Sequence, residues 1–105
     1  MERKEDVQIG EVTVCAREMI VQEVDDLLSG RLRPHIDPVI DSILDGPVGS
    51  EVLNVCTDAT AELLRKMTPT DLQRIADKVA ELNPFFVRLL GKLTAEQTET
   101  SSAQV

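Results

Sequence analysis

The chain has 105 residues, of which 42% are hydrophobic, and a formal net charge of −8. This length fits one domain with one modest core, and this hydrophobic fraction excludes wholesale disorder. The charge argues against nucleic acid and anionic membranes as main partners, because both would be repelled by residues 18–62, which hold ten acidic and two basic residues.

The expected core is aliphatic, because Phe85 and Phe86 are the only aromatic residues of the chain. Aliphatic side chains suit helices that pack ridge into groove, whereas most β-domains contain more aromatic residues. The sequence therefore predicts an all-α fold, a small antiparallel bundle or array of four to five helices.

The N-terminal third predicts a flexible lead followed by a long helix. Residues 1–10 are charged and end at Gly10, and from residue 11 apolar residues recur at steps of three and four, which predicts a helix over 11–29 that stops at Gly30. The apolar stripe consists of Val12, Cys15, Ala16, Met19, Ile20, Val24, Leu27 and Leu28. Val14 and Val21 fall outside this stripe, which indicates contact on a second side.

The middle of the chain predicts two further helices. Asp37 is a good N-cap and Pro38 suits the first helical position, so a short helix is expected over 38–45. Ser50 is the expected cap of a helix that continues through residue 67.

The last third predicts two helices and a tail. Thr68 and the proline after it begin a helix over 69–82, and the Asn-Pro pair at 83–84 repeats this pattern for a helix over 84–93. Residues 94–105 are polar, so a disordered tail is expected after a helical domain that spans 11–93.

Cys15 and Cys56 form no metal-binding motif, because they are far apart and no Cys/His cluster accompanies them. We expect two buried, reduced thiols, no metal site and no cofactor. The charged N-terminus is unlike a signal peptide, and no stretch approaches the roughly 20 apolar residues of a membrane span. A cytoplasmic location is the resulting expectation.

Asp37, Asp41 and Asp45 lie four residues apart and form one acidic row on the expected second helix. Three interpretations stay open: a solvated face, a docking surface for a basic partner, and, together with Asp25 and Asp26, a site for a divalent cation. The spacing matches no EF-hand loop.

The segment 84–93 is very apolar for its length. Phe85, Phe86, Leu89 and Leu90 could complete the core, anchor a protein partner or second copy, or lie on a membrane surface. We take these four residues and the three aspartates as candidate partner-binding residues.

The sequence contains no recognised catalytic motif. His35, the only histidine, could act as a general base beside Asp37, but no nucleophile motif or second histidine accompanies it. We therefore expect a non-catalytic protein-interaction module, an accessory or scaffold subunit of a homo-oligomer or larger complex. The alternatives are a helical bundle that binds a small ligand or divalent cation, and a small enzyme.

Overall fold

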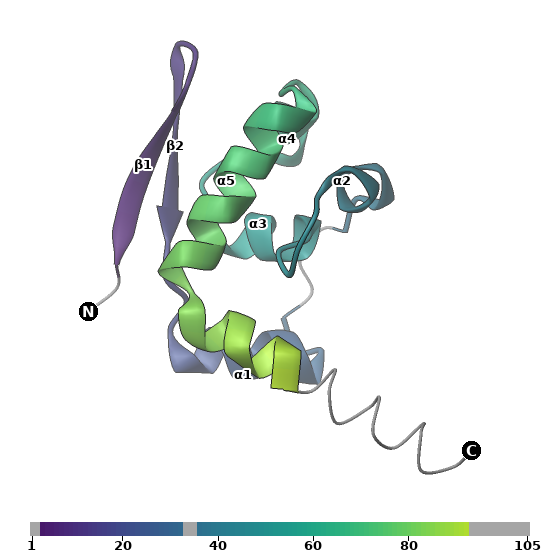
Figure 1. Ribbon diagram of the computed structural model, residues 1–105. Coiled ribbons are helices and arrows are strands. Elements are labelled where there is room, and N and C mark those ends of the chain that lie inside the picture. Colours follow the sequence, from purple (N-terminus) through teal and green to yellow (C-terminus); the bar gives the residue numbers. More distant parts are fainter. Residues whose placement is uncertain (1–2, 33–35, 93–105) are drawn as a thin grey trace.

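The computed structural model describes residues 3–32 and 36–92. A β-hairpin precedes a series of helices (Figure 1), so the fold mixes α and β structure and the all-α bundle expected from the sequence is wrong. The elements are β1 (Lys4–Ile9), β2 (Val12–Arg17), α1 (Val21–Ser29), α2 (Pro38–Ile43), α3 (Ser50–Cys56), α4 (Ala61–Arg65) and α5 (Pro69–Leu82). Residues 84–92 are also helical and are called helix 84–92 below.

The hairpin is a regular antiparallel pair in which Ile9 lies opposite Val12. The two-residue turn begins with Gly10, whose φ of +60° fits the Gly-first pattern of a type II′ turn. Side chains alternate along both strands: Val7, Val14 and Ala16 are buried on one face, while the other face is mostly exposed.

The helix expected over 11–29 is therefore wrong in its first half, because helical structure begins only at Val21. Over 12–17 an apolar pattern with helical spacing and one that alternates as in a strand share several positions. Val14 distinguishes them, because it is buried in the structure and only the alternating pattern makes it apolar-facing. The β-branched run at 12–14 after a glycine turn favours a strand, and tertiary packing on that face decides the outcome. Residues 4–9, within the expected lead, form the partner strand.

The hairpin packs on α5, which lies between it and α3 (Figure 1). The outer edge of β2 is held by the link after α3, because the Asp58 N–H donates to the Cys15 carbonyl and the Asp58 carboxylate accepts from the Cys15 N–H at 2.9 Å. Strands and helices thus share one core, and the largest of its fully buried side chains are Val14, Ile40, Leu53, Cys56, Leu72, Ile75, Val79 and Leu82.

The helix starts were predicted better than the strands. α5 has the expected bounds, and its cap Thr68 accepts from the Asp71 N–H. The helix expected over 50–67 is wrong, because 57–60 interrupt it: Thr57 ends α3, and the Thr60 hydroxyl caps α4 by accepting from the Leu63 N–H. The expected tail at 94–105 lies outside the described residues.

Candidate functional site

Asp37 is a structural carboxylate at the start of α2. Only 3% of the residue is exposed, and its side chain accepts from the N–H groups of Val39 and Ile40. It also accepts two hydrogen bonds from the Arg65 guanidinium, at 2.7 and 3.0 Å. Chiefly through these bonds, Arg65 lowers the pKa of Asp37 to about 2. Asp37 thus ties α2 to α4, and its charge is already neutralised.

The other aspartates of the acidic row contribute to local structure. The Asp41 carboxylate accepts from the Ser50 N–H at 2.7 Å and thereby holds the start of α3. Asp45 is exposed and bonds Gln73 through its own backbone groups. Asp25 and Asp26, on α1, pair with Arg31. Over residues 3–32 and 36–92, no three metal-ligating side chains gather as a cation site.

The two phenylalanines of helix 84–92 have opposite environments. Phe86 is 5% exposed and belongs to the core, whereas Phe85 is 70% exposed. The guanidinium carbon of Arg88 lies 5.5 Å from the centroid of the Phe85 ring, a cation–π contact. Leu89 and Leu90 are half-buried, and Leu90 packs against the core. The helix therefore completes the core on one side and presents an aromatic ring to solvent on another.

A small apolar groove runs between this helix and α1. Its volume is about 160 Å³, and its lining includes Met19, Val24 and Phe86. The exposed side chains of Val21 and Phe85 also line it, and Val21 is 85% exposed. We call Val21, Phe85 and the adjacent Ile20, which is also exposed, the Phe85 patch. Glu18 and Asn83 add polar atoms at the same groove.

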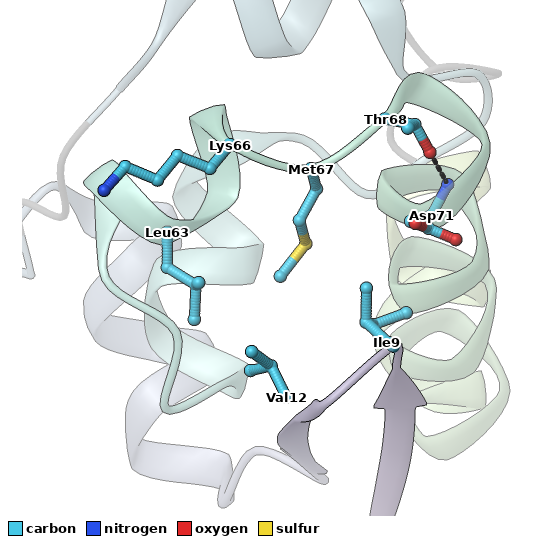
Figure 2. Close-up of a pocket in the computed structure, with 8 residues that line it drawn as sticks. Ile9, Val12, Leu63, Lys66, Met67, Thr68 and Asp71 are labelled. Atoms are coloured by element: carbon cyan, nitrogen blue, oxygen red, sulfur yellow. Dashed lines mark hydrogen bonds between the residues drawn. The ribbon is translucent and has the colours of Figure 1, made fainter.

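A larger groove, of about 430 Å³, lies at the tip of the hairpin. Figure 2 shows Ile9 and Val12 from the two strands near Leu63 of α4 and Met67 of the α4–α5 link. Its two charged side chains, Lys66 and Asp71, lie at opposite ends of the apolar floor (Figure 2). The groove thus offers apolar contact with few polar groups.

A buried polar joint connects the hairpin, α5 and helix 84–92. Asn83, 3% exposed, accepts from the Met19 N–H at 2.7 Å and donates to the carbonyls of Arg17 and Val79. Its own carbonyl accepts from the Val87 N–H. Each polar group of this side chain has a partner, so the joint ties the segment before α1 to the start of helix 84–92, the two sides of the smaller groove.

The cysteines provide no activated nucleophile at these grooves. Both are free thiols, and Cys56 is fully buried beside the joint. Burial raises the pKa of the Cys56 thiol to about 12, which keeps it protonated at neutral pH. His35, the candidate general base, lies outside the described residues.

The sequence indicated part of these surfaces. Phe85 was a candidate from composition alone, and Val21 stood out because it departs from the helical stripe. Ile9 and Val12 were missed as groove residues, because the hairpin that brings them to α4 was not predicted. An alternating apolar pattern around Gly10 was the signal that could have identified them.

Comparison of the chain with protein-family models, curated proteins and solved structures finds no significant match. Within the described ranges, no helix is both long and apolar enough to span a membrane.

Proposed function

We propose that this chain is a non-catalytic protein-interaction module, an accessory or scaffold subunit of a homo-oligomer or a larger complex. The observation that carries the proposal is the Phe85 patch, in which a mostly exposed aromatic ring and a mostly exposed valine line an apolar groove. An aromatic side chain has roughly 200 Å² of surface, so Phe85 alone leaves well over 100 Å² in water. Apolar patches of a few hundred Å² on soluble domains mark interaction sites.

The partner in this proposal is a protein. The net charge of −8 disfavours nucleic acid and anionic lipid. The two free thiols suit a reducing compartment, so we place the complex in the cytoplasm. The acidic row has a smaller part in this proposal than the sequence implied, because Asp37 and Asp41 are engaged within the chain.

The test is native mass spectrometry of the tagged full-length chain isolated gently from its own cells. After removal of the tag, we expect a mass of at least twice 11.6 kDa, or a mass that includes other chains. Phe85→Ala should abolish this assembly with little change in the free energy of unfolding, about 0.5 kcal/mol or less, because the ring is exposed. Val39→Ala, which truncates an exposed apolar side chain on α2, is the matched control and should leave the assembly intact.

Two results would defeat the proposal. One is a chain that stays a monomer both in extracts and after purification at high concentration. The other is an assembly that Phe85→Ala and Val39→Ala leave equally intact, because the Phe85 patch would then have no part in it.

The groove at the hairpin tip supports a second candidate function, the binding of a small apolar ligand. Its volume of about 430 Å³ falls in the range of small-molecule sites, and its lining is mostly apolar. Met67→Lys would place a charge in this groove. If the groove binds such ligands, the variant should lose the fluorescence enhancement of the uncharged apolar dye Nile red that the wild type shows, and equal enhancement in both proteins would reject this function.

A further inference from the structure

The Phe85 patch contains both a projecting group and a recess. The Phe85 ring stands out from helix 84–92, and beside it the groove of about 160 Å³ has an apolar lining of Met19, Val24 and Phe86. A surface that carries a knob next to a hole can dock on an identical surface, because a two-fold axis brings each knob to the other copy's hole. The patch is therefore suited to self-recognition.

Two charged side chains lie at or beside this groove: Glu18 lines it, and Arg88 contacts the Phe85 ring, which lines it. Within the described part of the chain, no basic side chain pairs with Glu18, and Arg88 contacts the Phe85 ring without an acidic partner. Arg88 stacks on Phe85, so it would accompany that ring into a second molecule's groove, where Glu18 lies. Opposite charges at the rim of an apolar contact fix its register.

We propose that a second copy of this chain docks on the Phe85 patch in a two-fold symmetric dimer. Phe85 of each copy fills the groove between α1 and helix 84–92 of the other, and Arg88 of each copy pairs with Glu18 of the other. This inference rests on the proposed function and gives it a partner, the chain itself. The buried joint at Asn83 supports the dimer by holding the walls of the groove in place before docking.

Charge reversal tests the reciprocal pairing. Sedimentation velocity of the full-length wild type, from low to high micromolar concentration, should show a monomer–dimer equilibrium. Glu18→Arg and Arg88→Glu should each weaken dimerisation at least tenfold, since each places like charges together at both ends of the interface. The double variant E18R/R88E should recover wild-type dimerisation to within a few-fold.

Mixing the two single variants is the decisive measurement. One copy then carries two arginines at the contact and the other carries two glutamates, so a heterodimer regains both ion pairs. A Glu18–Arg88 contact within one chain would be restored only in the double variant, never in the mixture. Melting temperatures close to that of the wild type would show that each variant is folded.

Lys66→Glu is the matched control, because it makes the same charge change at the hairpin-tip groove. It should leave dimerisation unchanged. A wild type that stays monomeric at every concentration overturns the dimer, and so does a mixture that fails to recover it. A dimer weakened by Lys66→Glu but not by Arg88→Glu would place self-association at the other groove. If the chain instead assembles with a different protein through Phe85, the proposed dimer is wrong and the proposed function is retained.

Discussion

Asp37 shows how one residue can combine a helix cap with an ion pair. Its folded-state pKa of about 2 lies below the ordinary value of 3.8, so its contribution to stability is complete above about pH 4 and is lost as the pH falls towards 2. The sequence identified the cap correctly. It could not reveal Arg65, because that partner lies 28 residues away on α4.

We expect Asp37→Asn to lower the melting temperature at neutral pH, because the amide loses the charge that Arg65 and the start of α2 stabilise. The difference from the wild type should narrow as the pH falls from about 4 to about 2, where the wild-type carboxylate also becomes neutral. Thermal unfolding followed by circular dichroism at several pH values measures this gap. Asp45→Asn is the charge-matched control, because Asp45 bonds Gln73 only through its backbone. A gap of constant size would show that the charge of Asp37 is not what stabilises the fold.

Cys56 allows a chemical test of burial. With its pKa raised to about 12 by desolvation, the thiol should resist alkylation at mildly alkaline pH until the protein unfolds. The variant Cys15→Ser retains Cys56 as its single thiol. Mass spectrometry after iodoacetamide treatment should detect little adduct in the folded variant and complete modification in denaturant. Rapid labelling of the folded variant would contradict the closed environment between α3 and Asn83.

Among the helices and strands, the sequence predicted those whose signal lies within a few residues. It failed for the strands, whose formation depends on packing partners far away in the sequence. Thr68 with Pro69 and Asp37 with Pro38 placed two helix starts correctly, because a cap depends on residues within one turn. The hairpin was missed because a six-residue strand is ambiguous until its burial is known. What settles it is the packing of the hairpin against α5, a contact between distant parts of the sequence, with Val14 of β2 fully buried in the core.

The Asn83 side chain joins the hairpin, α5 and helix 84–92, so its removal should destabilise these three elements together. Asn83→Ala removes the acceptor of the buried Met19 N–H and one hydrogen bond to the Arg17 carbonyl. We expect a loss of about 3 kcal/mol in the free energy of unfolding, since a buried unsatisfied group costs about 1–3 kcal/mol and the other lost hydrogen bonds add to this cost. Urea unfolding followed by circular dichroism measures this loss. Asn54→Ala, at an exposed position of α3, should change the stability by less than about 0.5 kcal/mol. Equal losses in the free energy of unfolding for the two substitutions would mean that the Asn83 joint does not stabilise the fold.

If two whole molecules form the proposed dimer, their thermal stability should depend on the protein concentration. Association that favours the folded state raises the melting temperature by mass action. The melting temperature of the wild type should therefore rise with protein concentration, while that of Phe85→Ala stays constant. Differential scanning calorimetry over a wide concentration range checks this. If the melting temperatures of both proteins changed with concentration in the same way, Phe85 would have no part in self-association.

Only part of the surface described here could be anticipated from the sequence. The composition identified the Phe85–Phe86 pair, but which ring faces solvent depends on how helix 84–92 packs on the core, where Phe86 is buried and Phe85 is not. The regular spacing of the acidic row favoured a shared surface. In the structure, Asp37 and Asp41 turn to partners on α4 and α3, because a carboxylate near an unpaired N–H or a guanidinium is more stable bonded than solvated.

The Asn83 joint also has a consequence for synthesis of the chain. The hairpin is made first, but the side chain that bonds the end of β2 lies 66 residues later, counted from Arg17, and α5, on which the hairpin packs, comes just before it. On a ribosome, residues 4–17 therefore lack α5, on which they pack, and the Asn83 side chain until residue 83 has left the exit tunnel. Isolated hairpins are only marginally stable in water. Folding of this domain is thus expected to be late and concerted, with the N-terminal strands among the last parts to become protected from proteolysis.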